Sequence, residues 1–275
     1  MSGAISPGVL AVETRIADGK AAVIAGSRIA LAVDAGIDDD EGAAVLSAAR
    51  SLQRETIKLV YTHGHADHVL GGTAFSGHDI LARRGIARQM TEQLDAWAER
   101  SGEAPGSLAA RLGWPTLVFD GEAAIDLGDR WVRLLDTPGH APDALCVYDE
   151  AHGVLFGGDT VVTAILPAFS DGDGPTLERT LRTLARLDAE VLVPGHGVVV
   201  MGRDSVRTAI EWAADYLARC IAHVDAGRGS GVEELVASAD YERFVGDQLP
   251  RERNRMAWRH EQTIRTLCAR RDMDD

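Results

Sequence analysis

A run of seven residues, THGHADH at positions 62–68, constrains this chain more than any other feature of the sequence. It holds three imidazoles and one carboxylate, which are ligand types that zinc takes where no thiolate is offered. The residues before it, 57–61, are largely apolar and rich in β-formers, so they predict a buried strand. Residues 70–73 predict a turn that leads into a helix. We therefore expect the ligands at the C-terminal end of a strand, where open α/β proteins place their sites.

The spacing inside this run predicts two neighbouring metal positions. His63 and His65 are two residues apart, so in an extended segment their side chains leave the same side of the chain and can reach one ion. Asp67 and His68 follow where the chain must bend toward the helix, and side chains in a bend can turn toward a second ion. The alternative is a polar surface loop that is rich in histidine by chance.

Three later turns each add one ligand type. Each turn follows a short apolar segment that predicts a strand, and each contains glycine, which lets the backbone approach a ligand closely. The turns are DTPGH at 136–140, GGDT at 157–160 and PGHG at 194–197. They contribute His140, Asp159 and His196, and three such turns make coincidence a poor explanation.

The order of these groups resembles the pattern of the metallo-β-lactamase superfamily. That pattern is an HxHxDH loop followed by a His, an Asp and a final His, and the match covers about residues 8 to 200 with no ligand missing. The resemblance implies one metal position held by three histidines, a second held by a carboxylate and two histidines, and a carboxylate that bridges them. The implied ligands are His63, His65 and His140 for the first metal, Asp67, His68 and His196 for the second, and Asp159 for the bridge.

The resemblance also implies the chemistry. Two divalent ions can share a hydroxide whose pKa is near neutral, and this hydroxide is the expected nucleophile. We expect two zinc ions per chain, with iron or manganese as alternatives, because a His/Asp site accepts several metals. Asp67 and Asp159 are the residues to which we assign catalytic roles. The expected enzyme is a metal-dependent hydrolase that acts on an ester-like carbonyl in a thioester, a lactone or an ester.

Other functions stay open as alternatives. A β-lactam hydrolase is disfavoured because β-lactamases of this superfamily carry Cys or Ser where this chain has Asp159. A phosphodiester hydrolase acting on nucleic acid is disfavoured because nucleases of the family usually carry an RNA-binding insert or a further domain. A mononuclear iron oxidoreductase resembling the persulfide dioxygenases keeps the same frame, and its metal content would distinguish it. A non-catalytic metal-binding module would be expected to lack a ligand.

Charge and composition limit the partners. The formal net charge of −14 argues against nucleic acid, which usually requires a basic surface. No run of 18 apolar residues exists, so we expect no membrane span, and residues 1–5 show no secretory signal. The three cysteines are far apart and odd in number, which predicts reduced thiols. We therefore expect a cytoplasmic enzyme with a small-molecule substrate, and a homodimer is one expected state because members of the family often dimerise.

The resemblance implies an α/β fold, a four-layer αββα sandwich with a helical insert and a C-terminal helical extension. We place the catalytic domain at residues 1–203 and the extension at 204–275. Periodicity and turn residues predict a β-meander at 8–34 and helices at 38–54, 83–112 with a break near 102–106, 176–187, 204–226, 231–239 and 251–270. The insert at 83–112 and the extension are natural walls for a substrate cleft.

Several further side chains have two interpretations each. Asp34 and Asp136 are candidates to hold the outer nitrogens of ligating imidazoles, or they are turn residues at strand ends. The acidic loop at 171–174 is a candidate for the mouth of the cleft. A basic patch on the insert either meets an anionic substrate group or forms a solvated helix face. Its residues are Arg83, Arg84 and Arg88.

Overall fold

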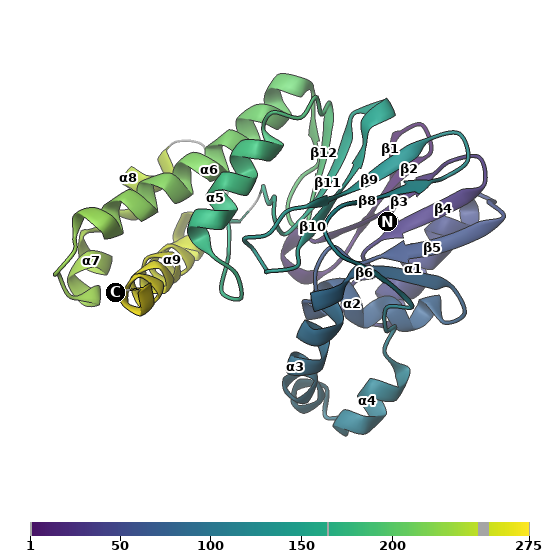
Figure 1. Cartoon of the computed structure of the whole chain (residues 1–275), viewed down its shortest axis with the longest axis horizontal. Helices are drawn as coiled ribbons and strands as arrows, with labels where there is room; N and C mark the ends of the chain where they lie inside the picture. Colours follow the sequence, from purple (N-terminus) through teal and green to yellow (C-terminus); the bar gives the residue numbers. More distant parts are fainter. Residues whose placement is uncertain (1, 164, 247–252, 275) are drawn as a thin grey trace.

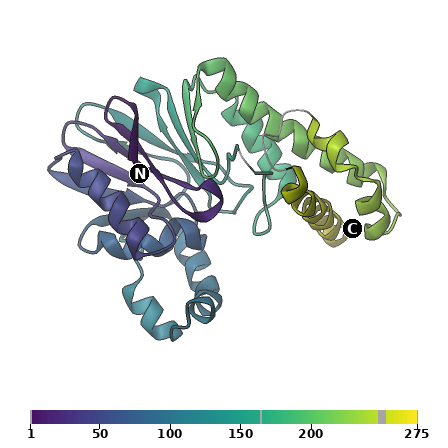
Figure 2. The ribbon, with the colours of Figure 1, turned by 180° about the vertical axis from the view of Figure 1, so that it is seen from behind.

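Two β-sheets face each other and helices cover both outer faces, so the computed structural model has four layers (Figures 1 and 2). The structure describes residues 2–163, 165–246 and 253–274. The helices are α1 (Asp39–Ser51), α2 (Ala66–Val69), α3 (Arg84–Ser101), α4 (Pro105–Arg111), α5 (Gly174–Leu184), α6 (Arg203–Ala226), α7 (Val232–Ser238), α8 (Tyr241–Val245) and α9 (Arg253–Asp274). This arrangement confirms the αββα sandwich expected from the sequence.

The first sheet has seven strands, and neighbours in space are neighbours in sequence. Its strands are β1 (Ser2–Ser6), β2 (Val9–Glu13), β3 (Lys20–Ala25), β4 (Ile29–Val33), β5 (Thr56–Val60), β6 (Asp79–Arg83) and β7 (Leu117–Phe119). The strands β1 to β4 pair antiparallel, and β4 to β7 pair parallel. The parallel half therefore points the carboxyl ends of β4 and β5 toward the same edge.

The second sheet has six strands in the order β13-β12-β11-β10-β9-β8. Its strands are β8 (Ala123–Asp126), β9 (Trp131–Asp136), β10 (Leu145–Asp149), β11 (Val154–Gly158), β12 (Val191–Pro194) and β13 (Val200–Met201). All pairs are antiparallel except β11 with β12, which is parallel and reached through α5. Both β11 and β12 end at the edge where β4 and β5 end.

The alternation of side chains along the strands builds the layers. In β9 and β10, Leu134 and Val147 face the first sheet, while Leu135 and Cys146 face the helices behind. Successive residues of a strand point to opposite faces, so both faces of these strands must be apolar when helices cover the sandwich. The three cysteines are buried and free, as the sequence predicted.

Local sequence explains where the outer helices begin. The side chain of Asp38 accepts a hydrogen bond from the backbone of Glu41 and begins α1, and Asp173 does the same for Thr176 at the start of α5. The residues Leu177, Leu181 and Leu184 then bury one face of α5. Helices α5, α6 and α9 share one apolar core behind the second sheet.

The C-terminal helices form an extension to the left of the sandwich in Figure 1, and α3 and α4 project below the sandwich. The predicted helices at 38–54, 83–112, 176–187, 204–226 and 231–239 are all present, and their bounds differ by a few residues. Strand β1 and the short helix α8 had no counterpart in the prediction. The helix predicted from 251 is described from residue 253 onward, and the domain boundary at residue 203 stays a prediction. Within the described residues, no helix has the length and apolar character needed to cross a membrane.

Candidate metal centre

All seven predicted ligands lie at the edge of the sandwich where strands of both sheets end. His63 and His65 follow β5, and Asp67 and His68 lie in the short helix α2, which begins directly after His65. The other three follow strands of the second sheet: His140 after β9, Asp159 after β11 and His196 after β12. The sequence predicted a bend at 66–68, and the structure forms this bend as one turn of helix. Because this helical turn is short, residues of a single loop reach both metal positions.

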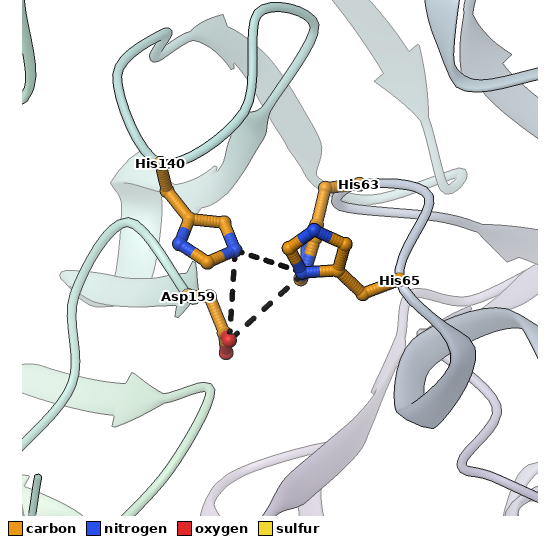
Figure 3. Close-up of side chains that lie close together, drawn as sticks. All are labelled: His63, His65, His140 and Asp159. Atoms are coloured by element: carbon orange, nitrogen blue, oxygen red, sulfur yellow. Dashed lines mark hydrogen bonds and ion pairs between the residues drawn. The ribbon is translucent and has the colours of Figure 1, made fainter. Parts of the chain in front are cut away.

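The first position is formed by His63, His65 and His140, with Asp159 beside them (Figure 3). The His65 Nδ1 atom lies 3.0 Å from His63 Nε2 and 3.1 Å from His140 Nε2. An oxygen of Asp159, Oδ2, lies 4.0 Å from His63 Nε2 and 3.7 Å from His140 Nε2. Three ring nitrogens and one carboxylate therefore converge on one point.

The outer nitrogen of every ligating imidazole faces an oxygen atom. The outer contacts are His63 Nδ1 to Thr62 Oγ1 at 3.1 Å, His65 Nε2 to Asp171 Oδ2 at 2.9 Å, His68 Nδ1 to Asp34 Oδ2 at 2.8 Å, His140 Nδ1 to the carbonyl of Ala168 at 2.7 Å and His196 Nδ1 to the carbonyl of Ile16 at 3.0 Å. Carbonyls and carboxylates only accept, so the outer nitrogen donates its hydrogen. In a neutral ring the inner nitrogen then presents a lone pair to the centre.

Lone pairs that face one another at 3.0–3.1 Å repel unless a cation lies between them. Nitrogen ligands of a tetrahedral zinc ion, each about 2.0–2.1 Å from the metal, stand about 3.3 Å apart. The separations of His65 Nδ1 from the other two inner nitrogens, 3.0 and 3.1 Å, are close to that value. The donor set of the first position therefore fits a divalent metal ion.

The second position is formed by Asp67, His68 and His196. The His196 Nε2 atom lies 3.4 Å from Asp67 Oδ2, and His68 Nε2 lies 3.9 Å from the same oxygen. Two imidazoles and a carboxylate thus meet beside the first cluster. Each residue offers one atom, and these atoms lie within 4.8 Å of one another.

Asp159 lies between the two clusters and turns one oxygen toward each. Its Oδ2 atom faces the first position, while its Oδ1 atom lies 3.3 Å from both His68 Nε2 and His196 Nε2. The Oδ1 atom and His68 Nε2 are both buried and have no hydrogen-bond partner among the described residues. Buried polar atoms without partners are costly, so this pair is a second observation that fits a bound cation.

Asp34 supports two ligands at once. Its backbone has φ of +60°, an uncommon conformation for which Asp is among the better tolerated residues. Its carboxylate accepts from the backbone and the hydroxyl of Thr62, at 2.7 Å each, and from His68 Nδ1. The Thr62 hydroxyl donates to Asp34, so it can accept from His63. One buried carboxylate therefore orients a ligand of each position.

In the metal-free protein the histidines of the two metal positions differ in their pKa values. Burial, together with the neighbouring histidines, holds the pKa of His63 well below its ordinary value, and burial lowers the pKa of His140 to about 4. Both rings are therefore neutral at pH 7. They are ready to bind a metal without releasing a proton.

At the second metal position the pKa values of the histidines are raised. Burial opposes a charge on His68 and His196, but nearby carboxylates, Asp159 above all, raise the pKa of His68 well above its ordinary value and that of His196 to about 9. Burial likewise opposes the ionisation of Asp67, but His68 and His196 bring the pKa of its carboxyl down to about 2. Burial acts on Asp159 in the same way, and the same two histidines hold its pKa well below the usual range.

The other candidates had mixed outcomes. Asp34 does hold an outer imidazole nitrogen, as one interpretation predicted, whereas Asp136 pairs with Arg83 instead. The remaining arginines of the predicted basic patch pair with carboxylates as well, Arg84 with Asp120 and Arg88 with Glu92. The patch is therefore a set of ion pairs.

Sequence reasoning missed two supporting residues. The carboxylate of Asp171 accepts from His65 and also from Gln89 Nε2 at 3.3 Å, while Gln89 Oε1 accepts from the backbone of Gly64 at 3.0 Å. The loop at 171–174 was predicted near the cleft mouth, and its contact with His65 places it beside the site. Nothing in the sequence marked Gln89, which lies on α3 of the insert.

Comparisons with known proteins show the family of the chain. The family model described as the metallo-beta-lactamase superfamily matches residues 19–196. The hydroxyacylglutathione hydrolase of Anaeromyxobacter dehalogenans is 30% identical over 214 residues, which cover 77% of this chain and 74% of that protein. The acyl-coenzyme A thioesterase MBLAC2 of Homo sapiens is 30% identical over 166 residues, 54% of this chain and 59% of its own length. The chain thus spans less than two thirds of that relative.

Solved structures give the same fold. A metallo-beta-lactamase family protein from Thermus thermophilus superposes with a TM-score of 0.67 at 21% identity, over 98% of this chain and 95% of its own. The sec-alkylsulfatase Pisa1 from Pseudomonas sp. gives a TM-score of 0.73 at 17% identity, over 98% of this chain and 50% of its own. At these identities the likeness concerns the fold alone.

Proposed function

The chain belongs to the metallo-β-lactamase superfamily, and on this premise we propose that it is a hydrolase with two divalent metal ions. The proposed substrate is a small molecule with an ester-like carbonyl, that is a thioester, a lactone or an ester. The proposed ions are zinc, with iron or manganese as alternatives.

One observation carries the proposal, namely the position of Asp159. Its two oxygens face different clusters, Oδ2 the histidines of the first position and Oδ1 those of the second. A carboxylate in this place can serve two ions a few ångströms apart. Such a pair of ions, when bound, supplies a water of lowered pKa and polarises the oxygen of the scissile bond.

The side chains of the chain have separate tasks in this proposal. Asp159 stays ionised throughout the physiological pH range, as does Asp67, because the pKa of each carboxyl is lowered. The Asp67 carboxylate lies beside His196 at the second position, where the two would hold the second ion together with His68. Asp34 and Asp171 hold imidazoles in place through their outer nitrogens.

The relatives favour a thioester within this class. One matched relative is named an acyl-coenzyme A thioesterase and another a hydroxyacylglutathione hydrolase. A linear primary-alkylsulfatase of Pseudomonas sp. also matches, at 25% identity over 68% of this chain. A sulfate ester is therefore a useful comparison substrate in the test.

The test is turnover by the zinc-loaded protein on a panel of small substrates. The panel comprises S-acetylglutathione, acetyl-coenzyme A, an acyl-homoserine lactone, a β-lactam, a phosphodiester and a primary alkyl sulfate. We expect chelator-sensitive hydrolysis of thioesters or of the lactone, and its loss in Asp159→Asn. Hydrolysis confined to the β-lactam, the phosphodiester or the sulfate would overturn the proposed substrate class. One iron per chain together with oxygen uptake on a persulfide would support an oxidoreductase instead.

A further inference from the structure

The C-terminal extension brings one arginine toward the metal centre. Helix α9 begins on the side of the extension that faces the sandwich and ends away from it (Figures 1 and 2). Arg259 lies in the second turn of this helix and is half-buried. Nothing in the sequence distinguished it from the other arginines of the chain.

Contacts farther along α9 show which way this side chain faces. Arg270 donates to the carbonyl of Ser170 at 3.4 Å, and the Leu267 side chain lies against Gly174 and Phe169. Residues 259 and 270 are eleven positions apart, which is about three helical turns, so they share one face. That face is turned toward the segment 165–174, which supplies the carbonyl of Ala168 and the carboxylate of Asp171 to the metal ligands.

Arg259 lacks the partners that comparable arginines have. Arg83 and Arg130 are also largely buried, and they pair with Asp136 and Asp149 at 2.6 and 2.9 Å. The Nε atoms of all three arginines are buried without a hydrogen-bond partner. Arg259 differs because no described carboxylate forms an ion pair with its guanidinium. The chain is acidic, with 42 Asp and Glu against 28 Lys and Arg, yet none of the described carboxylates pairs with this guanidinium. A half-buried guanidinium is costly without a counter-charge, so an anionic group of a ligand would stabilise it.

The surroundings hold the guanidinium in position and couple it to the site. Its central carbon lies 5.3 Å from the ring centre of Trp258, which restricts its rotation and leaves the ring exposed to solvent. Burial lowers the pKa of Arg259, and the largest opposing effect comes from the charge of Asp159. The guanidinium is therefore within electrostatic range of the carboxylate that both metal positions share.

We propose that Arg259 binds an anionic group of the substrate, a carboxylate or a phosphate on the part of the molecule that projects toward α9. The planar guanidinium suits both groups, because it offers paired donors to two oxygens. This inference rests on the proposed function and narrows it to substrates that carry such a group at a distance from the reacting carbonyl. It also makes the C-terminal extension a part of the binding site.

The test compares three thioesters that share the acetyl group. S-acetylglutathione carries carboxylates, acetyl-coenzyme A carries phosphates, and S-acetyl-N-acetylcysteamine is uncharged. In Arg259→Gln we expect KM for one of the anionic thioesters to rise about tenfold or more, since a hydrogen bond to a charged group is lost. We expect the uncharged thioester to change less than about twofold. The affected substrate tells carboxylate from phosphate, and Arg259→Lys should recover part of the loss.

A matched control lies on the same helix. Arg265→Gln removes the same charge from α9, but Arg265 pairs with Glu233 at the surface. We expect it to leave all three KM values unchanged. An equal loss on the charged and the uncharged thioesters in Arg259→Gln, or no loss on either anionic one, would overturn the inference.

A second measurement needs neither metal nor turnover. Calorimetry on the metal-free protein should detect binding of free glutathione or coenzyme A that Arg259→Gln weakens and Arg265→Gln does not. Equal binding by wild type and Arg259→Gln, or no binding by wild type, contradicts the inference. If the uncharged thioester is hydrolysed and the arginine has no selective effect, the inference alone fails. If no thioester is hydrolysed but binding depends on Arg259, the proposed function alone fails.

Discussion

The two metal positions are built from similar side chains, yet they differ in charge. The first has three imidazoles whose outer nitrogens donate to oxygens, and the pKa values of His63 and His140 are lowered. The second has its own carboxylate, Asp67, and two imidazoles whose pKa values are raised. In the metal-free protein, the inner ring nitrogens of His63 and His140 therefore present lone pairs, whereas those of His68 and His196 carry protons. The difference teaches that equal numbers of ligands do not make equal sites, because a metal must displace protons from the second.

Removal of the shared carboxylate should have the largest effect. In Asp159→Asn one negative charge between the clusters is lost, so we expect turnover to fall at least about a hundredfold, which corresponds to about 2.7 kcal/mol of activation free energy. Metal content should fall from two ions toward one per chain. Steady-state kinetics and elemental analysis on the same samples measure both. Asp136→Asn is the control, since this strand-end carboxylate pairs with Arg83. Unchanged turnover and metal content in Asp159→Asn would refute the bridging role.

Metal affinity should depend on pH at the second position only. The pKa of His196 is raised to about 9, so below pH 9 each unit of acidification should weaken the second ion by about tenfold for every proton displaced. The first ion should bind almost independently of pH between 7 and 9, because the rings of His63 and His140 are already neutral. Calorimetric titration with zinc in buffers of different ionisation enthalpy counts the released protons. Equal proton release for both ions would remove the distinction between the two positions.

Variants of the supporting carboxylates should also affect the two metal ions differently, with smaller changes in affinity. Asp34 contacts a ligand of each position, directly at His68 and through Thr62 at His63, so Asp34→Asn should weaken both ions by about 10- to 100-fold. Asp171 is more exposed and holds His65 alone, so Asp171→Asn should weaken only the first ion, by about tenfold or less. Competition with a chromophoric chelator measures each affinity. A larger effect from Asp171 than from Asp34 would contradict the assignment.

The smallest expected effect is on the stability of the metal-free protein. The folded-state pKa of His196, about 9, lies above its unfolded value of about 6.5, so the bound proton stabilises the fold below pH 6.5. This stabilisation is lost as the pH rises from 6.5 through 9. We expect Tm to fall by about 2–4 °C over this range for each kcal/mol lost. His196→Gln should flatten the fall, and zinc-saturated protein should not show it. A Tm that rises over the same range would contradict the assigned protonation.

The sequence predicted seven ligands, and the fold brings all seven side chains together. Each ligand followed a segment whose apolar residues predicted a strand, and parallel strands deliver such residues to one edge of a sheet. The four-layer fold followed from the resemblance, and the main helices from the periodicity of residues such as Leu177, Leu181 and Leu184. The short helix at 66–69 was not predicted, because four residues give no periodicity to detect.

The supports of the ligands could not be predicted from the sequence. His140 and His196 donate to the backbone carbonyls of Ala168 and Ile16. Every residue has such a carbonyl, so the sequence does not indicate which one is used. Asp171 lies 106 positions from His65, so only the fold brings them together. The same reason explains why the sequence pointed to the arginines of the insert, which are paired, and passed over Arg259.

One titration tests the central claim, that the chain works with two ions that share Asp159. Metal-free protein is loaded with increasing zinc, and bound zinc and thioester turnover are measured on each sample at pH 8. The account predicts that the first equivalent binds with little activity and that turnover rises with the second. Full turnover with one zinc per chain, or none with two, would contradict it.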